Sequence, residues 1–584
     1  MVRPDTSIGG WAVSGMRLVT FPEILRERAA TQPDKKAFVF LGADGRLAEE
    51  LTFGQLHQRA LSVAAKLTAN GLARHRALLL FPPGLDFVAA LFGCFYAGTV
   101  AVPVPFLLRN RSGSRIRSIR NDVDPAVVLT VSELKANMSF REKLFGADDK
   151  LAWIGLSELE KQGAAMALPQ PGPDDLALLQ YSSGSTGSPK GVMLSHSNLI
   201  ANNAMIAEAF DHTAELRGVG WLPMFHDMGL IGHVLQPVFV GGLSVLMSPF
   251  SFLQRPMLWL QAISTWKATT SGGPSYGFAL CLQAMETSKL DDIDLSSWRV
   301  AYCGSEKVRA DVLDQFAARL AERGFRRQSL APCYGLAEAT LFATGVRAGS
   351  GLRSASSEEA SRYRQPVASC GTARCGSSVE IVDAVTGRRR DDGHVGEIWL
   401  KGAHVARGYW RARGDDVFQA FTADGSGPYL RTGDLGFIQN GELFIVGRLK
   451  DLVIVNGLNH YAEDIEISAA RSHSLCLEFG SAAFAIESAG QEHAVLIQEI
   501  RRARARPLEL ATVVGKAMES TIREHGLRLF DVVLVRPRSL PRTSSGKISR
   551  SQARELYLDG RFDRLNALPH QSPQHRSLPE VTAP

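Results

Sequence analysis

The stretch YSSGSTGSPKG, residues 181–191, combines serines, a threonine, three glycines and Lys190 within eleven residues. Glycines let backbone N–H groups approach an anion closely, while hydroxyls and an ammonium add donors and positive charge. The preceding LALLQYSS is typical of a buried strand, and SHSNLIANNAMIAEAF after it is typical of an amphipathic helix. This order predicts a loop that binds the phosphates of a nucleotide, with a mobile surface linker as the alternative. It is not a Walker A loop, because G-x-x-x-x-G-K-S/T does not match.

The composition is that of a globular protein with more than one domain. The chain has 584 residues, 45% hydrophobic and 21% charged, which is too long for a single core. A net charge of +6 is small for this length and does not by itself imply binding to nucleic acid. Arginine is dense in RNRSGSRIRSIR (109–120) and RRARAR (501–506), where a solvated surface is the expected explanation.

Cysteine usage and apolar segments favour a cytoplasmic protein that is not an integral membrane protein. Seven cysteines without a CxxC pair indicate reduced thiols. The N-terminus MVRPDTSIGGWAVSG lacks an apolar run long enough for a signal peptide. FVAALFGCFYAGTVAVPVPFLL (87–108) approaches the length of a membrane span. Glycines and prolines interrupt it, so we expect a helix of about ten residues followed by a short strand.

Helical and strand patterns alternate through the first 340 residues, which predicts an α/β fold with largely parallel sheets. The run SVLM (244–247) is followed by Ser and Pro, and VAYCG (300–304) ends in Gly. These residues mark the carboxyl ends of strands, which is where ligands bind such sheets. Short strands follow from about 379, and Asn440-Gly441 predicts a type I′ hairpin turn. A smaller α+β domain is expected to begin near Lys450.

Four further segments contain residue types that a nucleotide reaction needs. In APCYGLAEAT, Tyr334 offers an aromatic face for a purine and Glu338 a hard oxygen ligand for Mg²⁺. In YLRTGDLG, Asp434 is suited to accept both ribose hydroxyls. Arg448 in VGRLKD lies at the predicted domain border, and Lys547 in LPRTSSGKISR lies in a Ser/Gly loop. Each alone has a structural explanation, such as core packing, a turn or an ion pair, but their order favours a nucleotide site.

With these segments the sequence resembles the acyl-adenylate-forming superfamily of acyl-CoA synthetases, luciferases and adenylation domains of peptide synthetases. The resemblance rests on YSSGSTGSPKG, YGLAE, TGD, GRLKD and RTSSGK and covers about residues 20–555. It implies a large N-terminal domain (1–449) of two α/β subdomains plus a small distorted β-barrel at about 369–447. A mobile α+β C-terminal domain (450–565) and a disordered tail (566–584) would follow.

The resemblance also implies roles for individual residues. Those expected to bind ATP are Ser183, Gly184, Ser185, Thr186, Gly187, Lys190, Gly304, Ser305, Tyr334, Gly335, Asp434 and Arg448. The first six would hold the phosphates, the next four the adenine, and the last two the ribose. Glu338 would bind Mg²⁺, Lys450 falls at the hinge between the domains, and Lys547 matches the catalytic lysine.

Four segments narrow the resemblance to fatty-acyl-AMP ligases, which hand their acyl group to a carrier protein. They are WLPMFHDMGLIGHVLQPVFVGG, SFLQRPMLWLQAISTWKATTSGGPSYGFALC, APCYGLAEATLFATG and GRLKDLVIVNGLNHYAEDIE. The stretch 346–368 resembles an insertion of this branch that is thought to restrain the domain swing needed for CoA. A neutral surface loop is the alternative. Leu458 and Asn459 stand where CoA ligases often have a basic residue.

The implied reaction converts a fatty acid and ATP into acyl-AMP and pyrophosphate. The acyl group then moves to the phosphopantetheine thiol of an acyl-carrier protein, supplied in trans, for lipid or polyketide biosynthesis. Arg502 and Arg504 are candidate contacts for an acidic carrier protein. The alternatives are a fatty acyl-CoA synthetase and a catalytically silent acyl-adenylate sensor. A nucleic-acid binder is disfavoured, because the arginine clusters lack interleaved aromatic residues.

His226 in MFHDMG has no second metal ligand at helical spacing, so a metal site is not expected there. The resemblance places it instead against the acyl carboxylate and the α-phosphate, as a second catalytic residue. The acyl chain is expected in segment 221–280, which mixes apolar and small side chains, although a packed core uses the same residue types. The candidates are Met224, Phe225, Gly229, Gly273 and Phe278.

Overall fold

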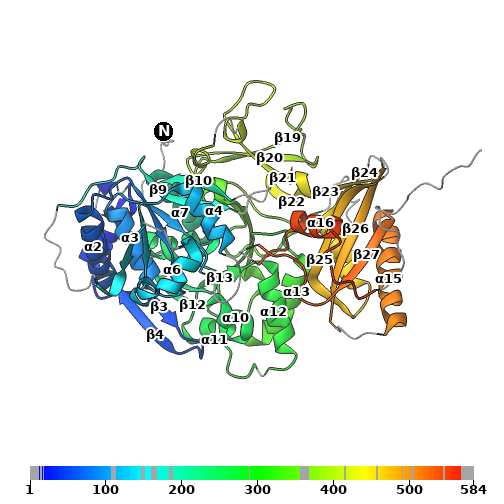
Figure 1. Cartoon of the computed structure of the whole chain (residues 1–584), viewed down its shortest axis with the longest axis horizontal. Coiled ribbons are helices and arrows are strands. Elements are labelled where there is room, and N and C mark those ends of the chain that lie inside the picture. Colours follow the sequence, from blue (N-terminus) through cyan, green and yellow to red (C-terminus); the bar gives the residue numbers. More distant parts are fainter. Residues whose placement is uncertain are drawn as a thin grey trace, which may run out of the picture. The chain divides into compact units, whose positions relative to one another are not determined.

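The structure is a computed structural model that describes residues 12–13, 16–17, 19–106, 113–146, 151–158, 167–182, 189–288, 290–355, 367–412, 416–455, 458–488, 491–501, 506–543 and 546–566. It divides into two compact units, shown in Figure 1. Unit 1 contains the described residues up to Ile445, and unit 2 begins at Val446. The exact domain borders expected from the sequence stay predictions.

Unit 1 contains a six-stranded sheet with the strand order β10-β9-β6-β5-β7-β8. The strands are β5 (Arg76–Leu79), β6 (Val100–Pro103), β7 (Val127–Thr130), β8 (Ala152–Gly155), β9 (Leu176–Ser182) and β10 (Lys190–Ser195). Neighbouring strands are parallel except for β10, which runs antiparallel to β9 at one edge. Every residue of β6 and β7 is buried, as expected for parallel strands that are covered on both faces.

A second sheet of unit 1 has eight strands in the order β16-β15-β14-β13-β11-β12-β3-β4. They are β3 (Lys36–Leu41), β4 (Leu47–Thr52), β11 (Arg217–Gly220), β12 (Leu243–Met247), β13 (Thr270–Gly273), β14 (Val300–Cys303), β15 (Leu330–Gly335) and β16 (Phe342–Gly345). Only the edge strands β4 and β16 are antiparallel to their neighbours. The expectation of an α/β fold with largely parallel sheets is therefore confirmed.

The helices of unit 1 are α1 (Phe21–Thr31), α2 (Phe53–Ala69), α3 (Asp86–Tyr96), α4 (Ser114–Val123), α5 (Ser132–Ala136), α6 (Met138–Phe145), α7 (His196–Phe210), α8 (Asp227–Gly229), α9 (Gln236–Val240), α10 (Pro249–Gln254), α11 (Met257–Thr265), α12 (Ser275–Met285) and α13 (Ala310–Leu320). The apolar segment that approached the length of a membrane span forms α3 and β6, as expected. Within the described residues, no helix is long and apolar enough to cross a bilayer.

A smaller sheet follows in the chain, with β19 (Ser378–Val382), β20 (Gly396–Lys401), β21 (Leu430–Gln439) and β22 (Glu442–Arg448) as neighbours in that order. Strands β19, β20 and β21 pair antiparallel. At the turn between β21 and β22, Asn440 and Gly441 both have positive φ, 53° and 77°. These values confirm the type I′ turn that the Asn-Gly pair predicts. Two short strand pairs, β1 (Ala12–Val13) with β2 (Met16–Arg17) and β17 (Ser354–Ala355) with β18 (Val367–Ala368), complete the unit.

Unit 2 is built on a three-stranded sheet of β25 (Cys476–Ser488), β26 (Gln491–Ile500) and β27 (Leu529–Val535). Its other elements are the hairpin β23 (Leu452–Val455) and β24 (Leu458–Tyr461), and helices α14 (Ala462–Arg471), α15 (Pro507–His525) and α16 (Arg550–Leu558). Alternate residues of β26 enter two separate cores: Leu496 packs with α14 and α15, while Val495 and Ile497 pack with Ala553 of α16. This period of two means that helices cover both faces of the sheet.

Four buried histidines make unit 1 sensitive to acid. Burial lowers the pKa of His196, His233 and His404 to about 4 and that of His212 to about 3. Unfolded histidine titrates near 6.5, so between these values the unfolded chain binds more protons than the folded one. The stability that these neutral rings contribute is therefore present above about pH 6.5 and lost as the pH falls toward 4.

We predict that the melting temperature of the wild type falls between pH 6.5 and 4.5. The melting temperature of H404Q should fall less steeply, because this variant lacks one titrating group. Circular dichroism melts across this range measure the slope. H394Q, at an exposed position, is the control. Equal slopes for H404Q and H394Q would contradict the prediction.

Candidate functional site

The residues predicted to contact adenine lie at one edge of the eight-stranded sheet. Gly304 and Ser305 directly follow β14, and Gly335 ends the adjacent strand β15. A Cβ atom on Gly304 would lie 2.8 Å from the carbonyl oxygen of Cys333, and one on Gly335 would lie 1.6 Å from that of Leu341. Ser305 has a positive φ of 74°. The backbone is thus tightly folded at the carboxyl ends of two parallel strands, which is where ligands bind such sheets.

Tyr334 and Asp434 form a buried pair that joins β15 to β21. The Tyr334 hydroxyl donates a hydrogen bond of 2.7 Å to Oδ2 of Asp434. The exposed fractions of the two residues are 8% and 4%. Gly433, with a φ of 70°, turns the chain immediately before the aspartate. A hydrogen bond to a carboxylate is strong in such surroundings, so Tyr334 fixes the direction in which Asp434 presents its oxygens.

Glu338 lies in the short 3₁₀ turn Ala337–Ala339 and contacts a residue that the sequence did not suggest. The Tyr409 hydroxyl donates a hydrogen bond of 2.8 Å to Oε1 of Glu338. Lys190, the first residue of β10, places its Nζ atom 4.6 Å from the centre of the Tyr409 ring. One aromatic side chain therefore contacts both the carboxylate predicted to bind a metal and the lysine predicted to bind phosphate.

Five predicted phosphate-binding residues, Ser183, Gly184, Ser185, Thr186 and Gly187, lie outside the described residues, so their role stays a prediction. The strands on either side are described. Ser182 of β9 pairs with Lys190 of β10, so the loop joins two adjacent antiparallel strands. This register fixes the start of β10 close to the end of β9, and it positions Lys190 independently of the loop.

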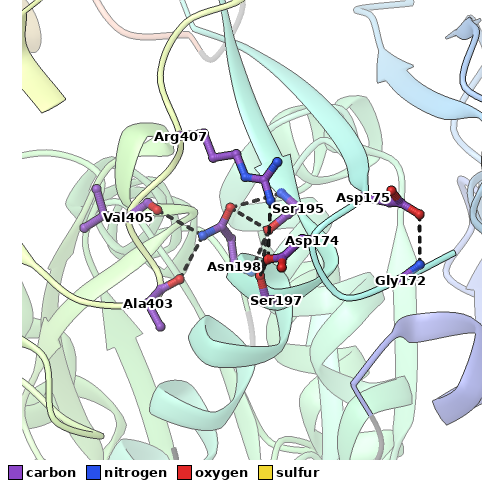
Figure 2. A network of polar contacts seen from close by, with 9 residues as sticks. All are labelled: Gly172, Asp174, Asp175, Ser195, Ser197, Asn198, Ala403, Val405 and Arg407. Carbon is purple, nitrogen blue, oxygen red and sulfur yellow. Dashed lines mark hydrogen bonds and ion pairs between the residues drawn. The ribbon is translucent and has the colours of Figure 1, made fainter.

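Figure 2 shows a polar network at the start of α7 that holds the segment leading to Tyr409. The Asn198 amide points between two carbonyl groups and donates to the oxygens of Ala403 and Val405, at 2.8 and 2.9 Å (Figure 2). An ion pair of 3.3 Å joins Arg407 to Asp174. The backbone N–H of Ala406 then donates to the carbonyl oxygen of Glu338 at 2.9 Å. The network thereby ties helix α7 to the turn that carries the glutamate.

His226 precedes the short helix α8, at the N-cap position. Its Nδ1 atom lies 2.6 Å from Oδ1 of Asp227, and the same oxygen accepts a hydrogen bond of 2.7 Å from the N–H of Met228. Asp227 therefore contacts both the imidazole and the start of the helix. A π-helix, Leu230–Leu235, follows directly, and such local widening is frequent at functional sites.

The candidate acyl residues differ in their surroundings. Met224 and Phe225 are half-buried, and the carbonyl oxygen of Phe225 accepts a hydrogen bond of 2.9 Å from the Gln180 amide. A Cβ atom on Gly273 would lie 2.8 Å from the Trp221 indole. The indole thus occupies the space that the missing side chain of Gly273 leaves.

Backbone and core packing account for Gly229 and Phe278. A Cβ atom on Gly229 would lie 2.2 Å from the carbonyl oxygen of Pro223. Phe278 is 0% exposed, and its ring centre lies 5.0 to 6.4 Å from those of Phe316, Trp259 and Trp298. For Phe278 these contacts match the core packing that the sequence left open as the alternative.

Arg448, Lys450 and Lys547 belong to unit 2. Arg448 ends β22, and Lys450 lies in the 3₁₀ turn Leu449–Asp451 that follows. Lys547 precedes α16, and its carbonyl oxygen accepts a hydrogen bond of 2.7 Å from the N–H of Thr543. The turn that carries this lysine is thus closed by its own backbone.

Arg550 links the turns that carry Lys450 and Lys547, and the sequence gave no reason to select it. Its guanidinium group donates two hydrogen bonds of 2.7 Å to Glu466 and one of 2.8 Å to Asp451. Asp451 follows Lys450, and Arg550 stands three residues after Lys547. The two turns are therefore fixed relative to each other within unit 2.

A pocket of about 560 Å³ lies elsewhere in unit 1, beside the second half of α7. Its walls include the charged residues Glu208 and Arg374 and the buried ring of His404. None of the predicted site residues that the structure describes lines it. Alanine and methionine side chains make up much of the remaining wall, so the lining mixes charged and apolar groups.

Residues 25–410 match the AMP-binding enzyme family. The chain belongs to this family. Residues 450–566 match the AMP domain of the Disco-interacting protein 2-like family. An AMP-binding enzyme accounts for the glycine-rich sheet edge, the buried Tyr334–Asp434 pair and the carboxylate of Glu338 within one unit.

Three relatives of this AMP-binding enzyme define its branch. It is 38% identical to the medium-chain-fatty-acid acyl-carrier-protein ligase JamA of Moorena producens, covering 94% of this chain and 96% of JamA. It is 36% identical to the putative fatty-acid CoA ligase fadD21 of Mycobacterium leprae, covering 93% and 98%. The fatty acyl-adenylate ligase from L. pneumophila, crystallised with acyl adenylate and pyrophosphate, matches with a TM-score of 0.71 at 34% identity, covering 94% and 99%. The predicted fatty-acyl-AMP ligase branch is thereby confirmed.

We predict that Y334F weakens ATP binding, because Asp434 loses the hydrogen bond that fixes its oxygens. Hydrogen bonds to charged groups contribute about 1.5–3 kcal/mol, so the dissociation constant for ATP should rise by about one to two orders of magnitude. Calorimetric titration measures it, with unfolding curves showing that the fold is retained. An unchanged dissociation constant in Y334F would mean that the pair does not serve the nucleotide.

Asn198 offers a separate test of the network in Figure 2. N198A removes both carbonyl contacts and the Oδ1 atom that accepts from the N–H of the N-cap residue Ser195, and we expect it to lower the free energy of unfolding by about 2–3 kcal/mol. N198D keeps an acceptor oxygen for Ser195 but turns an anionic oxygen toward the buried Ala403 and Val405 carbonyl oxygens, so it should lose at least as much as N198A. Urea unfolding measures both. Full stability of N198D would show that the carbonyl contacts contribute nothing.

Proposed function

We propose that the protein activates a fatty acid with ATP and transfers the acyl group to the phosphopantetheine thiol of an acyl-carrier protein, in the cytoplasm. The observation that carries this proposal is the near full-length similarity to JamA, whose name states this acceptor, in a chain that keeps the Tyr334–Asp434 pair. All seven cysteines are free, which suits a reducing compartment.

In the first step, a carboxylate oxygen of the fatty acid attacks the α-phosphorus of ATP. A new P–O bond forms, the bond from the α-phosphorus to the bridging oxygen breaks, and pyrophosphate leaves with the electron pair. Two anions must meet, and charge grows on the phosphoryl oxygens, so the site needs cations and oriented donors rather than a covalent nucleophile. We assign this work to the phosphate loop with Lys190, and to Lys547 of unit 2.

Glu338 suits a magnesium ion. Its carboxylate has two oxygens with about four lone-pair sites, so the bond from Tyr409 leaves capacity for an ion. The described part of the chain contains no cluster of three or more His, Cys, Asp or Glu side chains that would enclose a metal. Proteins usually hold Mg²⁺ by one or two carboxylates together with substrate phosphates, and we propose that Glu338 is such a carboxylate. When bound, the ion would neutralise charge on the phosphates.

The nucleoside and the acyl end are assigned to other groups. Asp434, oriented by Tyr334, accepts hydrogen bonds from the ribose hydroxyls, with Arg448 contributing from unit 2. The backbone at Gly304 and Ser305 borders the adenine. His226, oriented by Asp227, lies against the acyl carboxylate and the α-phosphate.

In the second step, the carrier thiol attacks the carbonyl carbon of acyl-AMP. The C–S bond forms, the C–O bond to the phosphate breaks, AMP leaves, and the thiol proton passes to solvent. We assign the thiol to a separate acyl-carrier protein, the acceptor that the name of JamA states. Arg502 and Arg504, the candidate contacts for that partner, lie outside the described residues.

Transfer to CoA is the second candidate function, because one relative is named a putative CoA ligase. Leu458 and Asn459, where many CoA ligases have a basic residue, begin β24, and Leu458 is 64% exposed. They offer no positive charge to CoA phosphates. Residues 356–366 of the stretch expected to restrain the domain swing lie outside the described residues, so that role stays a prediction.

Acceptor choice is measured by mass spectrometry after incubation with ATP, Mg²⁺ and a medium-chain fatty acid, with CoA in one reaction and a holo carrier protein in another. We predict acyl-AMP in both reactions and an acylated product only with the carrier protein. Acyl-CoA as the main product would instead support the second candidate function, transfer to CoA. Absence of acyl-AMP and pyrophosphate would contradict both.

K547A tests the lysine of unit 2. Removal of one donor to a transition-state charge costs about two to three orders of magnitude, so we expect the rate of pyrophosphate release to fall by about that factor. K516A, at an exposed position on α15, is the matched control and should retain the wild-type rate. A K547A rate within about twofold of the control would exclude Lys547 from adenylation.

A further inference from the structure

Tyr409 is held in place by its neighbours before any ligand binds. Residues 407–410 run antiparallel to β10, with Val192 paired with Tyr409. The N–H of Trp410 donates to the oxygen of Gly191 at 2.7 Å, and the N–H of Met193 donates to that of Gly408 at 3.0 Å. These bonds lie on both sides of the tyrosine and fix its backbone against the strand that follows the phosphate loop.

The strand register explains why Tyr409 meets Lys190. Lys190 and Val192 are two residues apart on β10 and therefore point to the same face. Tyr409 pairs with Val192, so its side chain stands on that face, diagonally across from Lys190. The contact of 4.6 Å between the Nζ atom and the ring centre follows from this geometry. Phe418 packs edge-on against the ring at 5.1 Å, which limits its rotation.

We infer that Tyr409 is a positioning residue for the divalent cation and the nucleotide phosphates, a role that rests on the proposed function of Glu338 and Lys190. Its hydroxyl holds Oε1 of Glu338, which directs the remaining lone pairs of the carboxylate toward the cation. Its ring face holds the Lys190 ammonium by a cation–π contact. One rigid side chain thus sets the spacing of the metal ligand and the phosphate-binding lysine.

Two variants separate the hydroxyl contact with Glu338 from the ring contact with Lys190. Y409F removes the hydroxyl and keeps the ring, so it should weaken cation binding and leave metal-free nucleotide binding unchanged. Y409L removes both contacts, so it should weaken cation binding and also nucleotide binding without metal. Tyr429 supplies a matched control, because its ring lies 5.6 Å from Nζ of Lys401 and its hydroxyl contacts Arg389.

The probe is Mn²⁺, whose binding to the full chain with α,β-methylene-ATP is read by electron paramagnetic resonance. We expect the dissociation constant of Mn²⁺ to rise about tenfold in Y409F and to stay unchanged in Y429F. Calorimetric titration of the analogue in EDTA should give the wild-type value for Y409F and an about threefold higher value for Y409L. Wild-type Mn²⁺ affinity in Y409F, or equal weakening in Y429F, would overturn the inference.

A double-mutant cycle keeps the test decisive if Y409F also loses stability. In an E338Q background the hydroxyl has no carboxylate to orient, so the further change from Tyr409 to Phe should leave Mn²⁺ affinity unchanged. The same loss in both backgrounds would show that Tyr409 does not act through Glu338. These measurements involve no catalysis, so a failure of the proposed ligase activity would be seen separately, as missing acyl-AMP.

Discussion

The parallel pairing of β13, β14 and β15 is the constraint on which the proposed nucleotide site depends. Gly273 pairs with Cys303, so the segments that follow these strands emerge at one edge of the sheet. Neighbouring carbonyl groups leave no room for a side chain at Gly304 or Gly335, so the tight backbone at this edge requires glycine at both positions. The buried Tyr334–Asp434 hydrogen bond then attaches the smaller sheet to that edge.

Charge is the second constraint, because the reaction brings two anions together. In the proposed site, the groups assigned to this task are fixed in advance. Lys190 is held by the register of β10, Glu338 by Tyr409, and the turn of Glu338 by the network around Asn198 (Figure 2). Such prior organisation costs no rearrangement at the moment of reaction, which is why oriented charges contribute strongly to catalysis. In unit 2, the hydrogen bonds of Arg550 to Asp451 and Glu466 fix the turn that carries Lys547.

Local rules explain which features the sequence predicted. The type I′ turn at Asn440-Gly441 and the break of the apolar segment into α3 and β6 follow from short-range preferences, as do the parallel sheets from alternating patterns. The Tyr409–Glu338 and Asn198–Ala403 contacts join residues 71 and 205 positions apart, and no local pattern marks them. For Phe278, the sequence could not distinguish a wall of an acyl tunnel from core packing, since apolar tunnels and apolar cores use the same residue types.

A crystal structure with a non-hydrolysable acyl-adenylate mimic tests the central claim most directly, namely that the sheet edge, Asp434 and His226 enclose one acyl-adenylate. The account predicts that the ribose hydroxyls contact the Asp434 carboxylate, that the purine lies beside Gly304 and Ser305, and that the acyl carbonyl lies near His226. A mimic bound elsewhere, with that sheet edge vacant, would contradict it.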